Sequence, residues 1–248
     1  MDRKKEALDC FIDEIRRSPT SKNIAKIIHY GSTFKGDYSQ ESDIDVLLVA
    51  TGDIKKVDEV ISNISYDLLL SMGERIEPMI YCFEDYLYPG YFVYKVKNEG
   101  KEVFSMNEQE LKRNEAIDLL VLAKKFNQMA KAIYQPENIR GVVDLAYNSA
   151  ELCAKSLILL EGKDIPKSHG GIVNKFSELL VKSAKVRIEL GRMLNRGLDK
   201  RNKARYDVHA AVSEEDAKPI LELSDELIAL LEEWIMGLDL ENRINLTK

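Results

Sequence analysis

The chain has 248 residues, of which 45% are hydrophobic, and its formal net charge is −6. This length and apolar content allow one large or two ordinary domains with buried cores, and the acidic balance argues against a protein that coats nucleic acid through its overall field. No run approaches the roughly 18 to 20 consecutive apolar residues that cross a bilayer, and the charged amphipathic N-terminus lacks a signal-peptide core. We therefore expect no membrane partner and a cytoplasmic location.

The pattern of apolar residues changes near residue 105. Before this point, short strand-like runs alternate with helical ones. The expected elements are a helix at 2–17, strands at 24–30 and 43–50, a helix at 53–72, a strand at 76–82, a helical run to about 98 and a short strand within 98–104. The sequence thus predicts a first domain at 1–105 that contains a small sheet.

After residue 105 the pattern is helical almost throughout. Pro219 lies inside the last helical pattern, which predicts that this helix begins later or is kinked. The expected helices span 110–134, 140–161, 171–183, 187–204 and 213–235. We expect them to form an all-α bundle at 106–248.

Two carboxylates and a glycine turn occur within fifteen residues of one another, in the stretch GSTFKGDYSQESDIDVLLV. Successive side chains alternate faces in a strand, so Asp43 and Asp45 are expected to project to one side of the predicted strand at its leading end. Mg²⁺ prefers carboxylate oxygens and completes its shell with substrate phosphates. Gly31 lets the backbone approach a polyphosphate closely, and Ser32 adds a hydroxyl donor. The pattern favours phosphoryl or nucleotidyl transfer.

The stretch GSTFKGDYSQESDID resembles the GS...G...SDxD signature of the polymerase β nucleotidyltransferase superfamily. The resemblance implies a Mg²⁺-dependent enzyme that moves a nucleoside monophosphate from a nucleoside triphosphate, with ATP expected, to an acceptor hydroxyl and releases pyrophosphate. It also implies that Asp43 and Asp45 are catalytic metal ligands for one or two ions. Gly31, Ser32 and Ser42 are implied to bind the nucleotide.

A third carboxylate on a later strand is part of the same resemblance, and the candidate here is Glu77 in RIEPMIYC. It would help the acceptor hydroxyl to attack or would bind a metal ion. Pro78 cannot donate to a sheet ladder, so we expect this strand at the edge of the sheet. Glu84 and Asp85 are weaker alternatives. If Glu77 is an ordinary surface residue, the domain binds nucleotide with little or no catalysis.

The helical half also has a resemblance. The segments AYNSAELCAKSLILLEGKDIPKSHGGIVNKFSELLV and RNKARYDV resemble HEPN domains over roughly residues 110–236. Many HEPN proteins are metal-independent ribonucleases in which a histidine follows an arginine by four to six residues. The resemblance also leads us to expect a homodimer through this domain. Here Arg201 is too far from His209, and Tyr206 stands where histidine is expected. Arg201, Asn202, Tyr206 and His209 are the candidate residues, although structural use of Arg201 and Tyr206 is favoured.

The fold class expected from both resemblances is α+β, with a small mixed-sheet nucleotidyltransferase domain followed by an all-α helical bundle. Three functions stay open. The first is nucleotidyl transfer to a small molecule, an RNA or a protein. The second is a toxin-antitoxin-like regulatory or nucleotide-binding module that modifies a partner or itself, with Tyr206 as an imaginable target. The third is a HEPN ribonuclease.

Overall fold

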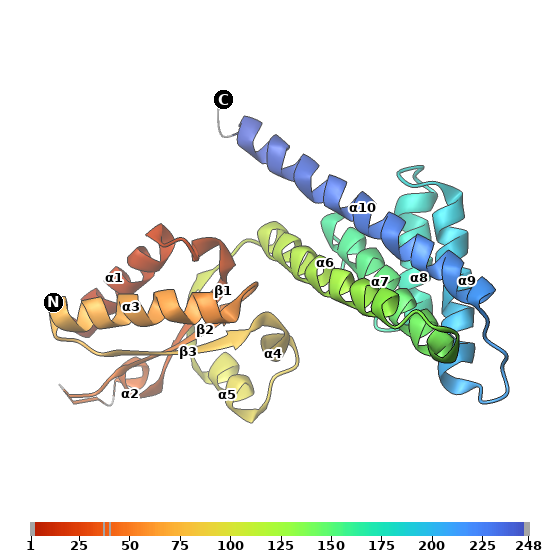
Figure 1. The fold of residues 1–248 in the computed structure, drawn as a ribbon. Coiled ribbons are helices and arrows are strands. Elements are labelled where there is room, and N and C mark those ends of the chain that lie inside the picture. The colour runs from red at the N-terminus through yellow and green to blue at the C-terminus, as the bar shows by residue number, and fades with distance from the viewer. Residues whose placement is uncertain (1–2, 37, 40, 246–248) are drawn as a thin grey trace. The chain divides into compact units, whose positions relative to one another are not determined.

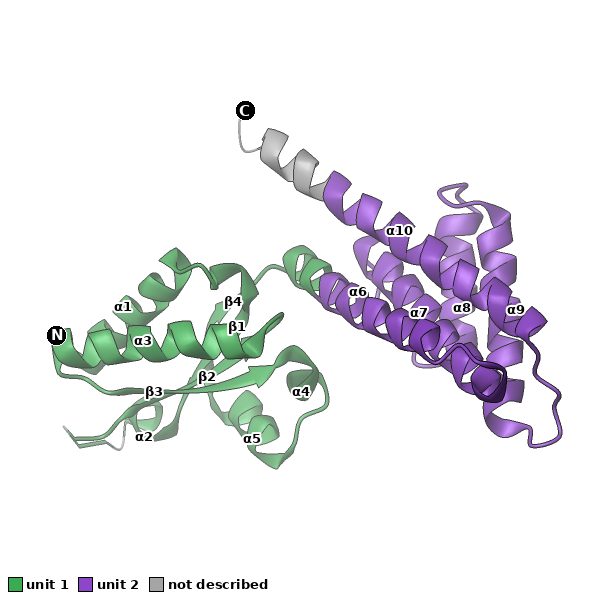
Figure 2. Ribbon diagram, viewed as in Figure 1, with its two compact units in different colours: residues 1–114 green, residues 115–248 purple. Residues whose placement is uncertain are grey.

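The computed structural model describes residues 3–36, 38–39 and 41–245, apart from the side chains of 238–245. The chain folds as two compact units, residues 1–114 and 115–248 (Figure 2). The change of pattern in the sequence lies at residues 105 and 106, shortly before this division. The first residue of the expected N-terminal helix, Asp2, lies outside the described residues.

The first unit is built on a mixed sheet (Figure 1). This sheet has four strands in the order β3-β2-β1-β4. The central pair, β1 and β2, is antiparallel, β4 is antiparallel to β1, and β3 is parallel to β2. The strands are β1 (Ile24–Tyr30), β2 (Ile44–Ala50), β3 (Ile76–Cys82) and β4 (Lys101–Ser105). The mixed sheet and the edge position of β3 are both confirmed. Pro78 is tolerated because β3 has only one neighbouring strand.

Helices cover both faces of this sheet, because β2 is apolar on both sides. Ile44, Val46 and Leu48 share one buried cluster with α1 and α3, whereas Leu47 and Val49 share the opposite cluster with α4 and α5. The helices of this unit are α1 (Arg3–Arg17), α2 (Gly31–Lys35), α3 (Ile54–Met72), α4 (Phe83–Leu87) and α5 (Tyr91–Glu99), and a 3₁₀ turn spans Ser21–Asn23. The sequence predicted one helical run to residue 98. Two helices form instead, because Pro89 disfavours helical geometry in the residue before it.

The second unit is a helical bundle, as the sequence predicted. Its central helix is α7, which contacts both α9 and α10 and buries the Tyr147 ring and Leu157 completely. Helix α6 begins in the first unit and continues into this one. The elements are α6 (Glu108–Ala132), a 3₁₀ turn at Pro136–Asn138, α7 (Ile139–Leu160), α8 (His169–Phe176), a π-helical segment at Ser177–Val181, α9 (Ile188–Tyr206) and α10 (Glu214–Asn245).

Two expectations for this bundle are corrected. The helix expected at 171–183 is divided into α8 and the π-helical segment that follows it. Of the two consequences expected for Pro219, the later start of the last helix is wrong. This helix starts at Glu214 and contains Pro219 near its beginning, where the missing N–H removes one backbone hydrogen bond. Among the described residues, no helix has both the length and the apolar character needed to cross a membrane.

Candidate active site

The ends of β1, β2 and β3 bring a tyrosine and two carboxylates side by side. Asp45 lies opposite Tyr30 on one neighbouring strand and beside Glu77 on the other. Asp43 immediately precedes β2. Because side chains alternate along a strand, a register shift of one residue would move Asp45 to the opposite face. The observed register therefore places Asp45 and Glu77 on one face of the sheet, near the starts of β2 and β3.

Gly31 follows β1 directly and packs against the Asp45 carboxylate. Its φ is +79°, and a Cβ at this position would lie 1.9 Å from Asp45 Oδ2. A residue with a side chain would pay the cost of left-handed backbone and would also displace the carboxylate. The glycine and the aspartate that the sequence motif singled out are thus in direct contact, with Ser32 next in α2.

The charges of Asp43, Asp45 and Glu77 favour the binding of a cation. Burial raises the pKa of Asp45, and the negative charges of Glu77 and Asp43 raise it further. Burial also raises the pKa of Tyr30 to about 12, again with contributions from Asp45 and Glu77. Carboxylates that repel one another in a partly desolvated place bind a positive ion more readily than isolated ones. A divalent cation would relieve this repulsion.

Arg75 is a site residue that the sequence reasoning missed. Its guanidinium lies 3.3 Å from Glu77 Oε1 and 3.8 Å from Asp43 Oδ2, and it is well exposed. The alternation of β3 could have indicated it, since residues two apart share a face. Within the described part of the chain, no ion pair reaches Asp45, so this carboxylate has no protein cation against it.

The donor set fits magnesium, although the side chains are not gathered into a cage. Among the described residues, no group of three or more His, Cys, Asp or Glu side chains is arranged to hold a metal ion. Magnesium is commonly held by only one or two carboxylates, with waters and substrate phosphates as its other ligands. Asp43 and Asp45 are the residues that would bind it. Glu77 lies beside Asp45 but pairs with Arg75.

Ser42 has a structural role in the turn before β2. Its hydroxyl oxygen accepts a hydrogen bond from the backbone N–H of Ser39 at 3.0 Å, and its carbonyl accepts one from Lys4 at 2.6 Å. The two weaker acidic alternatives, Glu84 and Asp85, lie in the first turn of α4. Acids in this position favour the start of a helix.

The candidate HEPN residues gather only in part. Arg201 is buried, and its guanidinium donates to Asp144 Oδ1 at 3.1 Å and to Asn202 Oδ1 at 3.2 Å. Tyr206 is 68% exposed, and the Arg201 and Arg205 guanidiniums lie 5.6 and 5.9 Å from the centre of its ring. His209 lies in the loop after α9. The expected structural use of Arg201 is consistent with its buried pairing.

Arg140 holds this loop in place. It is a second residue that the sequence reasoning missed. Its guanidinium donates to the carbonyl oxygens of Ala204 and Asp207 at 2.9 Å each, and to that of Ala210 at 2.5 Å. The signal could not be read from sequence, because the partners are more than 60 residues away. A single guanidinium therefore fixes the end of α9 and the backbone that carries His209.

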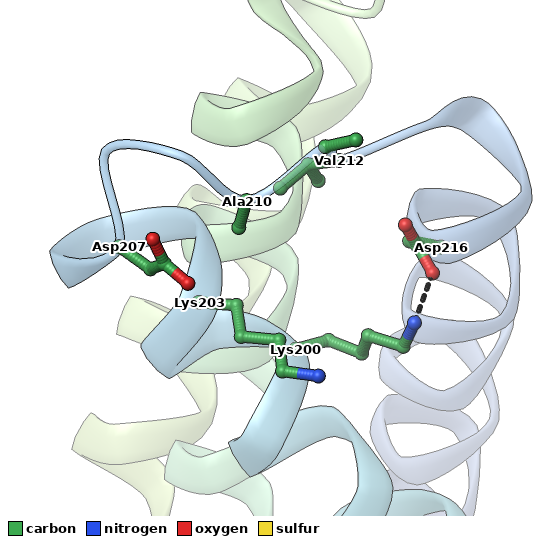
Figure 3. A pocket seen from close by; sticks show the side chains of 7 residues that line it. Lys200, Lys203, Asp207, Ala210, Val212 and Asp216 are labelled. Carbon is green, nitrogen blue, oxygen red and sulfur yellow. Dashed lines mark hydrogen bonds and ion pairs between the residues drawn. The ribbon is translucent and has the colours of Figure 1, made fainter.

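A cavity of about 230 Å³ lies between α9, the loop after it and the start of α10 (Figure 3). Its acidic side chains already accept from neighbours: Asp216 pairs with Lys200 and accepts from the Ser213 N–H, and Asp207 accepts from the N–H of His209. The lining residues are Lys200, Lys203, Asp207, Ala210, Ala211, Val212 and Asp216. No predicted site residue lines this cavity.

Both halves of the chain match known families. Residues 11–103 match the family described as the nucleotidyltransferase domain, and residues 116–234 match the HEPN domain. The two matches lie in the same order as the two resemblances and cover the sheet-containing and helical parts of the chain respectively.

Two individual proteins are also similar. One relative is the protein named "Putative toxin MJ0142" of Methanocaldococcus jannaschii. The two chains are 28% identical over 110 residues, which cover 44% of this chain and 74% of that protein. The other is a crystal structure of spectinomycin adenyltransferase AAD(9) from Enterococcus faecialis with ATP and spectinomycin. Its sequence is 14% identical to this one. The superposition covers 90% of this chain and 98% of that chain, with a TM-score of 0.31.

Proposed function

We propose that this chain, in which a nucleotidyltransferase domain is followed by a HEPN domain, transfers a nucleoside monophosphate from a nucleoside triphosphate to an acceptor hydroxyl. The observation that carries the proposal is the contact between Gly31 and Asp45, where a backbone without a side chain meets a partly buried carboxylate that has a raised pKa. This is the arrangement in which a polyphosphate and a cation could be held together. ATP is the nucleotide that we propose.

Five residues of the candidate site have roles in the proposed reaction. Asp43 and Asp45 hold Mg²⁺, and Gly31 and Ser32 lie against the phosphates. Glu77 takes the proton of the acceptor hydroxyl as its oxygen forms a bond to the α-phosphorus. The bond between that phosphorus and the oxygen bridging to the β-phosphate breaks, and pyrophosphate leaves. When bound, Mg²⁺ supplies charge stabilisation for the attacking and leaving oxygens.

The proposal predicts that labelled nucleotide is transferred only when both aspartates are present. The test is incubation with each nucleoside triphosphate, radioactive at the α-phosphate, and Mg²⁺, with and without cell extract. Asp43→Ala and Asp45→Ala should abolish the labelling. The matched control is Asp58→Ala, which removes an exposed aspartate of α3 in the same unit. Full activity of Asp45→Ala would overturn the mechanism.

The exposure of Tyr206 favours a second candidate, a regulatory module that modifies itself. Its hydroxyl is a possible acceptor because the side chain is 68% exposed, and the guanidiniums of Arg201 and Arg205 near its ring would attract a phosphate. The relative named as a toxin agrees with such a role. Mass spectrometry would detect an added nucleoside monophosphate on Tyr206. An unmodified protein after incubation with ATP, Mg²⁺ and extract would argue against this candidate.

A further inference from the structure

Lys4 is a buried lysine in a helix whose other early lysine is exposed. It is only 7% exposed, whereas Lys5, the next residue of α1, lies on the exposed side. Lysine is almost never fully buried unless it is paired, because removing an ammonium group from water is costly. A buried lysine at the first turn of a helix therefore indicates a specific partner set.

The partners of Lys4 lie 38 and 70 residues away along the chain. Its Nζ donates to the carbonyl oxygen of Ser42 at 2.6 Å and to Glu74 Oε2 at 2.9 Å. Both partners lie just before a strand, since β2 begins two residues after Ser42 and β3 two residues after Glu74. One ammonium group therefore binds the segments that lead into both strands.

These two segments carry the acidic residues of the candidate site. Asp43 follows Ser42 directly, and Glu77 lies three residues after Glu74. A backbone hydrogen bond from the N–H of Ile44 to the carbonyl of Arg75, at 2.9 Å, joins the same two segments. Lys4 thus adds a charged contact beside the first backbone bond between the strands that carry the carboxylates.

We infer that Lys4 is a positioning residue, which holds the Ser42 carbonyl and the Glu74 carboxylate. In this way Asp43, Asp45 and Glu77 keep the spacing that a metal ion and a nucleotide require. This inference rests on the function proposed above. Lys4 does not touch the reacting atoms. Docking of α1 does not depend on it alone, because Ala7, Leu8 and Phe11 of the same helix are buried in the cluster that α1 shares with the sheet.

The first test is amide hydrogen exchange of the protein without metal or nucleotide, comparing Lys4→Met with Lys5→Met. Methionine keeps the apolar stem and removes the ammonium group. Loss of a hydrogen bond to a charged donor predicts exchange at residues 42–46 and 75–77 that is faster by about tenfold or more. Exchange in the helical bundle should stay unchanged. Lys5→Met should match the wild-type protein.

The second test separates positioning from general stability. Lys4→Met should need a higher Mg²⁺ concentration for half-maximal nucleotide transfer, and excess Mg²⁺ should recover much of the lost activity, because the carboxylates remain present. Glu74→Gln, which retains the contact between Lys4 and Ser42, should fall between Lys4→Met and wild type. If Lys4→Met does not fold, Glu74→Gln and Lys4→Arg supply the same comparison.

The outcomes distinguish the inference from the function on which it rests. Equal exchange rates and equal Mg²⁺ dependence in Lys4→Met and Lys5→Met overturn the positioning role. Faster exchange at residues 42–46 in Lys4→Met, with no nucleotide transfer by the wild-type protein, supports the role of Lys4 in holding the two segments and overturns the proposed function.

Discussion

Replacing Gly31 by alanine tests the geometry of the site most sharply. A Cβ at this position would lie 1.9 Å from Asp45 Oδ2 and 2.8 Å from its Cγ, on a backbone with φ of +79°. The left-handed conformation and the strain around it cost about 1 to 3 kcal/mol. The overlap also forces the Asp45 carboxylate to move, and a misplacement of about 1 Å can lower the rate about a hundredfold.

Gly73 supplies a matched control in the same unit. Its φ is +73°, but beyond its two chain neighbours no atom lies within 4 Å of the place that a Cβ would occupy. The left-handed backbone should therefore lower the free energy of unfolding of Gly73→Ala by about 1 to 2 kcal/mol. This variant should retain nucleotide transfer. Gly31→Ala should lose stability by a similar or larger amount and lose about a hundredfold or more of the transfer rate.

The two variants are compared by transfer of radioactive α-phosphate and by exchange of the most protected amides of β1 and β2, which reports the stability of the sheet. Two results would refute the reasoning. The first is a Gly31→Ala variant that transfers nucleotide at the wild-type rate. The second is an equal loss of transfer in Gly73→Ala, which would assign the effect to backbone strain rather than to the displaced carboxylate.

Three further predictions concern charge, packing and loop structure. In metal-free protein at neutral pH, Asp45→Asn should raise the melting temperature, because the raised pKa of Asp45 means that its ionised form destabilises the folded state. Thermal scans in EDTA should show that this gain in melting temperature shrinks as the pH falls through the folded-state pKa of Asp45. Leu157→Ala should cost about 2 to 5 kcal/mol, measured by urea unfolding with Trp234 fluorescence, since this is the one tryptophan of the chain and packs against the same core. Arg140→Met should make the loop after α9 more susceptible to protease, because three of its carbonyl contacts are lost; cleavage no faster than in wild type would contradict this.

The strands of the candidate site could be predicted well from the sequence because their signals are local. The run at 24–30 and the run at 76–82 have the bounds that the alternating apolar pattern predicted. Pro78 indicated the edge position of β3 through its missing N–H. Asp45 and Glu77 lie side by side because β2 and β3 are parallel neighbours in the observed register. Neither the order of the strands nor their register can be predicted from the sequence of one strand alone.

Contacts between distant segments could not be predicted in the same way. Helical periodicity puts Lys4 on the same face as Ala7 and Leu8, but it does not indicate the partners at positions 42 and 74 that make its burial favourable. Arg140 acts through contacts that no sequence motif indicates, because its partners lie more than 60 residues away. The π-helical segment after α8 likewise depends on packing in the bundle, because its sequence is as apolar and periodic as an ordinary helix.

The most direct measurement for the proposed function is the fate of the two ends of the triphosphate in parallel reactions with ATP labelled at the α- or at the γ-phosphate. The proposal predicts that an acceptor gains label only from α-labelled ATP, that the γ-label appears in pyrophosphate, and that both results disappear in Asp45→Ala. Label on the acceptor from γ-labelled ATP, or equal α-labelling by the wild-type protein and Asp45→Ala, would contradict the assignment of nucleotidyl transfer to this site.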